Sequence, residues 1–333
     1  VRTIFEYTSS MTRSHFTLPK DLSGTRVCVT GGAGFIGSHL VEALLSHNAA
    51  VSVLDDFSSG TRDNLPLGAA GLTVHEGSIL DAELMGGVFA EASVVFHHAA
   101  LVSVPESFER PDAYRLVNVE GTRRVLEASR AAGVNRVVYA GSCSAYGNLP
   151  GLPKVESDPV EPTSPYAQTK LDGELLVEQH AAEATLDTVR LRYFNIFGPR
   201  QAHDSPYAAV VPKFVEALQS GGTPLIFGDG GQTRDFVHVR DVVQANLLAA
   251  TRPEPIGGQV INVGSGHRIS ILEVLEIVAA SMGVPMAVEY RPERPGEVRD
   301  SEASIELARQ LLGYEPSCAL ADSVSEIQIS LQS

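Results

Sequence analysis

A tyrosine and a lysine stand four positions apart in the segment SPYAQTK, as Tyr166 and Lys170. Residues 166–183 read as a helix, and side chains at positions i and i+4 of a helix share a face. We therefore expect the phenol and the ammonium to point into the same space, where a phenol can transfer protons. The plain structural alternative is a surface tyrosine that packs on a lysine stem.

The pKa of a phenol makes it a poor base at neutral pH. Lowering that pKa from about 10 by ~3 units requires about 4 kcal/mol. One cation at ~5 Å supplies ~3 kcal/mol at an effective dielectric constant of about 20. The Lys170 ammonium alone is therefore not enough, whereas two cations suffice even after some loss to desolvation.

Two further hydroxyl groups precede this helix. Ser142 and Ser144 lie in AGSCSAYG, directly after an apolar run that reads as a strand. Ligands of doubly wound sheets bind beyond the carboxyl ends of the strands. We therefore expect both serines to lie close to Tyr166.

Short β-branched strands alternate with amphipathic helices over the first two thirds of the chain. This order is typical of βαβ units and of a parallel sheet that is covered on both faces. The expected strands are 26–32, 50–56, 72–78, 93–100, 136–142 and 186–194. The clearest helices are 35–47, 113–133 and 166–183.

The fold class predicted from this order is α/β, with a doubly wound parallel-sheet Rossmann domain and a smaller C-terminal α/β substrate domain. We expect a loosely ordered leader over 1–20, the Rossmann domain over 21–195, and most of the smaller domain over 196–333. Pro and Gly punctuate the last part. A later strand near 258–265 is expected to return to the first sheet.

Composition excludes several classes of function. The net charge of −15 argues against nucleic acid as a partner, because phosphate backbones require basic surfaces. No apolar run approaches the ~18–20 residues of a membrane span. The three cysteines, Cys28, Cys143 and Cys318, are widely spaced, which argues against disulfides or a metal site and favours a reducing cytoplasm.

A glycine-rich turn, TGGAGFIG, follows the first strand and opens the first helix. It places Gly31, Gly34 and Gly37 where a tight turn, an approach to pyrophosphate and close helix–strand packing require glycine. Asp55 and Asp56 end the second strand, and an acid there hydrogen-bonds an adenosine ribose and repels a 2′-phosphate. The set predicts NAD binding, and the oxidised nicotinamide ring is then the second cation near Tyr166.

Six motifs together resemble the extended short-chain dehydrogenase/reductase family. They are TGGAGFIG, NVEGT, SCSAYG, SPYAQTK, RYFNIFGPRQ and TRDFVHVRDV, and the resemblance spans roughly residues 26–316. Within the family the chain is most similar to nucleotide-sugar 4-epimerases, particularly the UDP-N-acetylglucosamine 4-epimerase branch.

The resemblance implies a mechanism. Tyr166 would take the proton from the sugar 4-hydroxyl while C4 delivers a hydride to NAD⁺, and the 4-keto sugar would turn and receive the hydride on its other face. Ser142 would hydrogen-bond the same oxygen, Ser144 would lie nearby, and Lys170 would also bind the nicotinamide ribose. A UDP-sugar is thus the expected partner, in a cytoplasmic homodimer built from the helices around 114–131 and 166–181.

The resemblance also assigns binding residues. The cofactor set comprises Gly31, Gly34, Phe35, Ile36, Gly37, Asp55, Asp56, Ser78, Ile79, Ala99, Ala100, Asn118, Tyr166, Lys170 and Tyr193. The substrate set comprises Ser103, Ser142, Tyr166, Asn195, Gln201, Ala209, Val210, Arg234, Arg294, Glu297 and Ser301. Asn195, Arg234 and Arg294 would contact the diphosphate, and Glu297 a ribose.

Some positions bear on the sugar. Ser301 stands where glucose-restricted relatives have a bulky tyrosine, and Ser103, Gln201 and Ala209 match the branch that accepts an N-acetyl group. Two positions depart from the family pattern. Ser78 replaces an aspartate that contacts adenine, and Val102 replaces a glycine or lysine.

Other functions compete with a UDP-hexose 4-epimerase. Dehydratases and decarboxylases of the family carry an acid just after the active-site hydroxyl residue, where this chain has Cys143 and Ser144. A UDP-glucuronate 4-epimerase needs a cation for the sugar carboxylate, and Arg192 or Arg200 could serve. A non-catalytic NAD-binding protein on the same fold is the third alternative. We expect His97 and His98 to pack or line the cofactor, and Cys143 to be a small filler.

Overall fold

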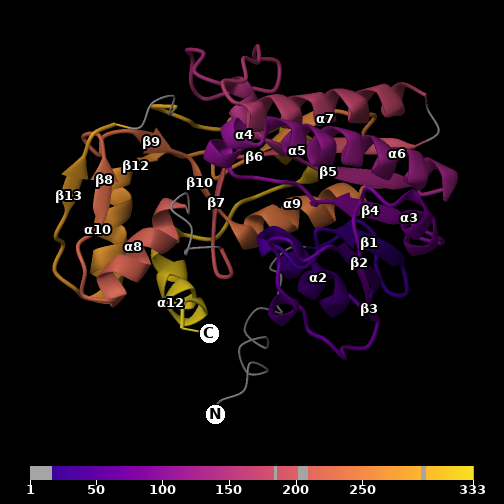
Figure 1. The fold of residues 1–333 in the computed structure, drawn as a ribbon, viewed down its shortest axis with the longest axis horizontal. Coiled ribbons are helices and arrows are strands. Elements are labelled where there is room, and N and C mark those ends of the chain that lie inside the picture. The colour runs from indigo at the N-terminus through magenta and orange to yellow at the C-terminus, as the bar shows by residue number, and fades with distance from the viewer. Residues whose placement is uncertain (1–16, 184–185, 202–208, 294–297, 333) are drawn as a thin grey trace.

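Short runs of valine, isoleucine and leucine form the centre of a seven-stranded sheet in the computed structural model (Figure 1). The structure describes residues 17–183, 186–201, 209–293 and 298–332. Every neighbouring pair of strands in this sheet runs parallel. From edge to edge the strands are β11 (Val260–Val263), β6 (Asp187–Tyr193), β5 (Arg136–Ser142), β4 (Val94–His97), β1 (Arg26–Thr30), β2 (Ala50–Asp55) and β3 (Leu72–Glu76).

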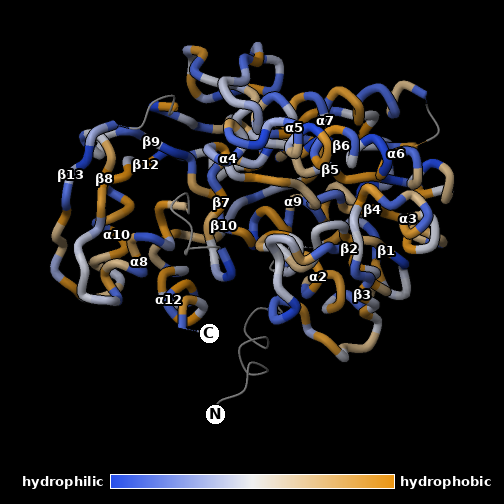
Figure 2. The backbone as a smooth tube through the Cα atoms, viewed as in Figure 1, coloured by the Kyte–Doolittle hydropathy of each residue, from blue (hydrophilic) through white to orange (hydrophobic). Residues whose placement is uncertain are grey.

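The strand predictions are confirmed. All six strands of the first two thirds are present, and β11 returns to the sheet beside β6, within the range predicted for it. The central strands are buried along most of their length because helices cover both faces. Figure 2 shows these strands as apolar segments in the interior of the larger part of the molecule.

Two groups of helices cover the sheet. One face packs against α2 (Phe35–Ser46), α9 (Val239–Thr251) and α11 (Glu306–Leu312), and these elements share one apolar core with the strands. The other face packs against α3 (Ala82–Val88), α6 (Gly121–Ala131) and α7 (Pro165–Ala182).

The predicted helix 113–133 is continuous but not uniform. It comprises α5 (Pro111–Tyr114), a π-helical stretch (Arg115–Glu120) and α6. The short helix α4 (Val104–Glu109) precedes it and, like α5, contacts α7.

A second, smaller core lies beside the carboxyl ends of the sheet strands, at the left of Figure 1. Its helices are α8 (Val210–Gln219), α10 (Ile271–Met282) and α12 (Leu320–Ser330). Three two-stranded sheets accompany them: β7 (Asn195–Phe197) with β10 (Phe236–His238), β8 (Leu225–Phe227) with β13 (Glu289–Arg291), and β9 (Thr233–Arg234) with β12 (Ile269–Ser270).

The chain crosses between the two cores more often than the sequence indicated. Besides β11, the helices α9 and α11 come from the last third of the chain and pack on the large sheet. The division near residue 195 therefore describes the smaller core but not these two helices. Of the leader predicted over 1–20, only 17–20 fall within the described residues, and they form no helix or strand.

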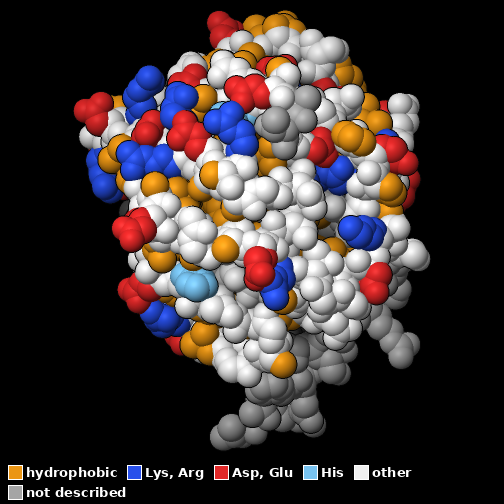
Figure 3. Space-filling model, turned by 90° about the vertical axis from the view of Figure 1, so that its right-hand side faces the viewer, with side chains coloured by type: hydrophobic (Ala, Val, Ile, Leu, Met, Phe, Trp, Pro, Cys, Tyr) orange, Lys and Arg blue, Asp and Glu red, His pale blue; other side chains and the backbone are white. Residues whose placement is uncertain are grey.

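The amino ends of the sheet strands lie at the end of the molecule away from the smaller core. Figure 3 shows this end, on which basic and acidic side chains are interspersed. Exposed ion pairs such as Arg26–Glu91 and Arg130–Glu183 belong to this mixed surface. None of the helices in the described ranges is long and apolar enough to cross a membrane.

Candidate active site

The glycine turn between β1 and α2 is shaped by close backbone contacts. Gly31 has a φ of +69°, and a Cβ there would lie 2.6 Å from the backbone nitrogen of Ala99. A Cβ on Gly37 would lie 2.1 Å from the carbonyl oxygen of Gly31. Within the described ranges, no side chain caps the amino end of α2 at Gly34. The turn thus leaves a helix N-terminus open to an anionic group, which fits the pyrophosphate of a dinucleotide.

Asp55 supports this turn. Its Oδ2 accepts a hydrogen bond from the backbone N–H of Ala33 at 2.8 Å, and its Oδ1 accepts from Phe57 at 2.8 Å. Burial raises the pKa of the Asp55 carboxyl, against the lowering by these two hydrogen bonds. Asp56 is exposed and accepts from Ser58. The acid at the end of β2 therefore fixes the loop that would hold a ribose.

Gly37→Ala tests the packing of the turn. The added Cβ has no room beside the Gly31 carbonyl, so the turn must shift and its open N–H groups move with it. We expect NAD affinity to fall at least about tenfold and the midpoint of thermal unfolding to decrease by several degrees. Gly86→Ala on α3, where a Cβ meets nothing within 4 Å, is the matched control, and calorimetry with and without NAD measures both effects. Equal NAD affinity in the two variants would contradict this role.

The other predicted cofactor residues lie after β3, after β4, on the π-helical stretch and at the end of β6. Ile79 is buried and Ser78 accepts a hydrogen bond from the Leu80 N–H. Asn118 is buried and binds the backbone of Leu101 through both ends of its amide, at 2.8 and 2.9 Å. It therefore acts on the segment after β4, which contains Ala99 and Ala100. Tyr193 is also buried, with its hydroxyl bonded to Asn246.

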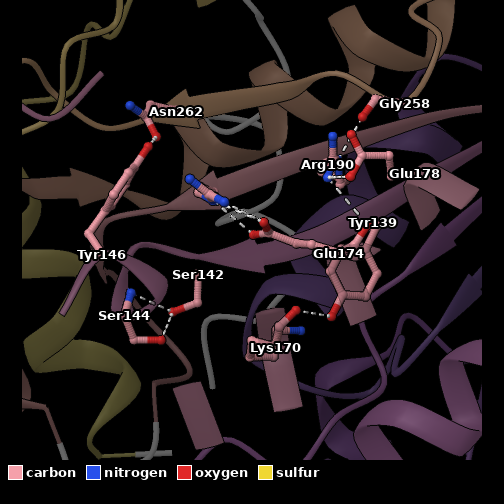
Figure 4. A network of polar contacts seen from close by, with 11 residues as sticks. Tyr139, Ser142, Ser144, Tyr146, Lys170, Glu174, Glu178, Arg190, Gly258 and Asn262 are labelled. Carbon is pink, nitrogen blue, oxygen red and sulfur yellow. Dashed lines mark hydrogen bonds and ion pairs between the residues drawn. The ribbon is translucent and has the colours of Figure 1, made fainter. Parts of the chain in front are cut away.

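Tyr166, Lys170 and Ser142 come together as the spacing predicted. Tyr166 and Lys170 lie one turn apart on α7, which packs against β5, and Ser142 ends that strand. The Ser142 and Ser144 hydroxyls are 2.8 Å apart (Figure 4). Lys170 is buried, and its Nζ lies 4.5 Å from the centre of the Tyr139 ring.

The pKa of Tyr166 is set by burial and by the neighbouring Ser142 hydroxyl. Burial raises the Tyr166 pKa to about 12, and the group that lowers it is the hydrogen-bonding Ser142 hydroxyl, not the Lys170 ammonium. Burial also lowers the pKa of Lys170 to about 8, opposed by Glu174. In the protein chain by itself the phenol is therefore protonated at neutral pH, as expected when only one of the two cations is present.

The two histidines after β4 are not catalytic acids or bases. His97 is buried between the hydroxyls of Thr30 (2.8 Å) and Thr122 (3.0 Å), and burial lowers its pKa to about 3. His98 stacks on Tyr193, and burial lowers its pKa to about 4. Both are neutral packing groups, as predicted.

Cys143 behaves as a filler. It packs against the large core, and burial raises the pKa of its thiol to about 12.

Asn195, Ser301 and Arg234 lie together where the small sheets meet the large one. Asn195 Nδ2 donates to Ser301 Oγ at 3.2 Å and to the carbonyl of Asp235 at 3.3 Å. Arg234 is largely buried, and its Nη1 donates to the carbonyl of Arg299 at 2.7 Å. A guanidinium held in this way suits a diphosphate.

The remaining predicted substrate residues are less informative. Gln201 donates to the Ile196 carbonyl at 2.9 Å, next to Asn195, and Ser103 caps α4. Ala209 and Val210 stand at the start of α8. Arg294 and Glu297 lie outside the described residues.

The two arginines suggested as partners of a sugar carboxylate each form an ion pair with a glutamate of the chain. Arg192 forms a buried ion pair with Glu174 at 2.7 Å. Arg200 pairs with Glu42 of α2 at 2.5 Å.

Sequence reasoning missed two buried carboxylates beside the site. Asp235 accepts from the backbone N–H groups of Ser265, Gly266 and Ala303, and so joins three segments around Asn195. Glu174 follows Lys170 by four residues, and this helical spacing could have indicated that the two side chains share a face. Nothing local in the sequence marks the long-range contacts of Asp235.

Comparison with known proteins agrees with this geometry. Residues 27–264 match the family described as "NAD dependent epimerase/dehydratase family". The chain belongs to this family. The matched residues include both the glycine turn and the Tyr166–Lys170 pair.

Several relatives of this family member are UDP-sugar epimerases by name. It is 42% identical over 306 residues to a UDP-glucose 4-epimerase of Mycolicibacterium smegmatis, covering 90% of this chain and 96% of the relative. A solved UDP-N-acetylglucosamine 4-epimerase from Methanobrevibacter ruminantium, in complex with UDP-N-acetylmuramic acid, has a TM-score of 0.87 at 36% identity and covers 93% and 98% of the two chains. A UDP-glucose 4-epimerase from Thermotoga maritima, with UDP-glucose, has a TM-score of 0.87 at 35% identity and covers 92% and 99%.

Proposed function

We propose that this family member is an NAD-dependent 4-epimerase of a UDP-hexose, either UDP-GlcNAc/UDP-GalNAc, UDP-Glc/UDP-Gal or both, and that it works in the cytoplasm. The observation that carries the proposal is the Ser142 hydroxyl beside Tyr166, with Lys170 one turn further along α7. The open amino end of α2 above Asp55 supports NAD as the cofactor.

Each residue of the site then has a chemical role. Tyr166 removes the proton from the sugar 4-hydroxyl and returns it after the 4-keto sugar has turned. Ser142 hydrogen-bonds the same oxygen and stabilises the phenolate. Lys170 holds the nicotinamide ribose. Bound NAD would supply the hydride acceptor for C4 and the second positive charge near Tyr166.

The residues after Ser142 argue against elimination chemistry. A dehydratase needs an acid–base partner for the neighbouring carbon, and here Cys143 and Ser144 occupy the places where an acid would stand. The Cys143 thiol keeps its proton. Epimerisation needs no such partner.

The diphosphate and sugar ends are assigned by the same reasoning. We assign the diphosphate to Asn195 and Arg234, and the surroundings of the sugar C2 substituent to Ser301. Serine is small, so an N-acetyl group has room there. The division into an NAD-binding part (21–195 with 258–265) and a substrate part (196–333) is part of this proposal.

A panel of UDP-sugars tests the function. The protein is incubated with UDP-Glc, UDP-Gal, UDP-GlcNAc, UDP-GalNAc and UDP-glucuronate without added reductant, and 4-epimers are separated by chromatography. We expect interconversion within one or both hexose pairs. Turnover of UDP-glucuronate alone would assign the chain to the uronate epimerases, and the absence of any epimer would support the non-catalytic alternative.

A surface on the outer helices supports the proposed homodimer. Large apolar side chains are exposed on α4, on the π-helical stretch and on α7, which lie together at the top of Figure 1. They include Phe108 (60% exposed), Leu116 (49%) and Leu175 (46%). Exposed apolar groups gathered in this way are typical of an interface between subunits.

Leu116→Glu is expected to weaken the dimer. A carboxylate buried between two subunits without a partner is costly, so the dissociation constant should rise at least about tenfold. Leu67→Glu is the control, since Leu67 is similarly exposed (56%) in a loop away from these helices. Sedimentation at micromolar concentration measures the mass of each variant. A monomeric wild-type protein would contradict the proposed assembly.

A further inference from the structure

Glu174 is a fully buried carboxylate that the proposed mechanism does not use. It lies on α7 one turn after Lys170, with a side chain that is 0% exposed. Arg192 of β6 donates to both of its oxygens, with Nε at 3.0 Å from each and Nη2 at 2.7 Å from Oε2. Such charge-assisted bonds are short and directional, and they fix the position of the Glu174 carboxylate.

The Glu174 carboxylate fits against β5 because residue 141 is a glycine. A Cβ on Gly141, the residue before Ser142, would lie 2.8 Å from Glu174 Oε1. A Cβ on Gly173 would lie 2.2 Å from the Tyr139 hydroxyl. Helix α7 therefore approaches β5 through two glycines, and the Glu174 carboxylate lies against β5 (Figure 4).

Several charged or titratable groups face Lys170. Its own helix contributes Tyr166 and Glu174, and β5 contributes Tyr139. His97 ends β4 and His98 follows it, and Arg192 of β6 reaches Lys170 through Glu174. The histidines are neutral, and the Tyr139 hydroxyl donates to the Lys170 carbonyl at 3.2 Å. Among the described residues, Glu174 is the one that opposes the effect of burial on the Lys170 ammonium.

We propose that Glu174 is a positioning residue whose carboxylate, fixed by Arg192, keeps the head of Lys170 protonated at the pH at which the site works. Arg192 occupies both carboxylate oxygens, so Glu174 acts on the ammonium through space, and no direct ion pair between them forms in the described part of the chain. The ammonium thus stays available to a cofactor ribose. This inference rests on the proposed function for its consequence, but the charge state of Lys170 can be measured without it.

Glu174→Gln tests the proposal by lysine NMR. The chain has four lysines, Lys20, Lys154, Lys170 and Lys213, so protein labelled with [¹³Cε]lysine gives a simple spectrum, and Lys170→Arg identifies the Lys170 signal. The wild-type signal should titrate near pH 8. Removing the negative charge leaves burial unopposed, so the midpoint should fall by about one pH unit. The alkaline limit of epimerase kcat/KM should move down with it.

Glu178→Gln is the matched control. Glu178 lies one further turn along α7 and pairs with Arg190 of β6 at 3.2 Å, but its side chain is 57% exposed. This variant loses the same charge at an exposed position, so the Lys170 titration should keep its wild-type midpoint. A residue with only a structural role at position 174 would change stability but not this midpoint.

A double variant covers the case in which Glu174→Gln unfolds because Arg192 is left unpaired. Glu174→Gln with Arg192→Met removes both charges, which proteins often tolerate, and should again lower the Lys170 midpoint. An unchanged midpoint in either folded variant overturns the proposal. A lowered midpoint in a protein that epimerises no UDP-sugar supports the role of Glu174 and refutes the proposed function instead.

Discussion

Tyr166→Phe is expected to lower epimerase turnover by a factor on the order of 10²–10⁴, the usual contribution of a positioned proton-transfer group. The ring keeps its volume, so packing on α7 is retained. The phenylalanine has no proton to exchange with the sugar 4-hydroxyl, while the glycine turn and Asp55 are untouched. NAD should therefore still bind. Turnover with a saturating UDP-hexose and NAD affinity by calorimetry are the two measurements.

Tyr290→Phe is a suitable control for this variant, because Tyr290 is exposed on β13 and lies in the smaller part of the molecule. It should epimerise at the wild-type rate. Near-normal turnover by Tyr166→Phe would refute the assignment of the proton-transfer group, whichever sugar is used.

The charge state of Tyr166 gives this assignment a further check. In the chain alone burial raises its pKa to about 12, so the NAD-free protein should show no Tyr166 phenolate in its ultraviolet difference spectrum at neutral pH. The oxidised cofactor supplies the missing cation, and the titration should move to lower pH when NAD is bound.

Ser301→Tyr is expected to separate the two classes of sugar. The new ring would occupy space beside Asn195, whose amide now donates to the Ser301 hydroxyl at 3.2 Å. An N-acetyl group needs that space and a hydroxyl does not. Activity on UDP-GlcNAc should therefore fall at least about tenfold further than activity on UDP-Glc, a difference typical of pocket size.

Ser301→Ala distinguishes lost space from a lost hydrogen bond. It removes the contact with Asn195 without adding volume, and should affect both sugars alike. If Ser301→Tyr reduced kcat/KM equally for the acetylated and the plain hexose, position 301 would not govern the choice of sugar.

Much of the fold could be predicted because its signals are local. The β-branched runs of β1 to β6 and the alternation with helices specify a parallel sheet whatever the rest of the chain does. The glycine turn and the i, i+4 spacing of Tyr166 and Lys170 are likewise set by backbone geometry over a few residues. The packing of α9 and α11 on the large sheet was not predicted, since it depends on contacts with β5, β6 and β11, which are distant in the sequence.

The sequence by itself thus determined the parallel sheet, the turn before α2 and the shared face of Tyr166 and Lys170, because steric rules and helical periodicity act over a few residues. The tertiary structure decided the charges. Burial raises the pKa of Tyr166 and lowers that of Lys170. The fold also brings Arg192 of β6 against Glu174 of α7, where the two form a buried ion pair. Desolvation and ion pairing depend on which groups of distant segments share an interior, and that information is spread over the whole chain.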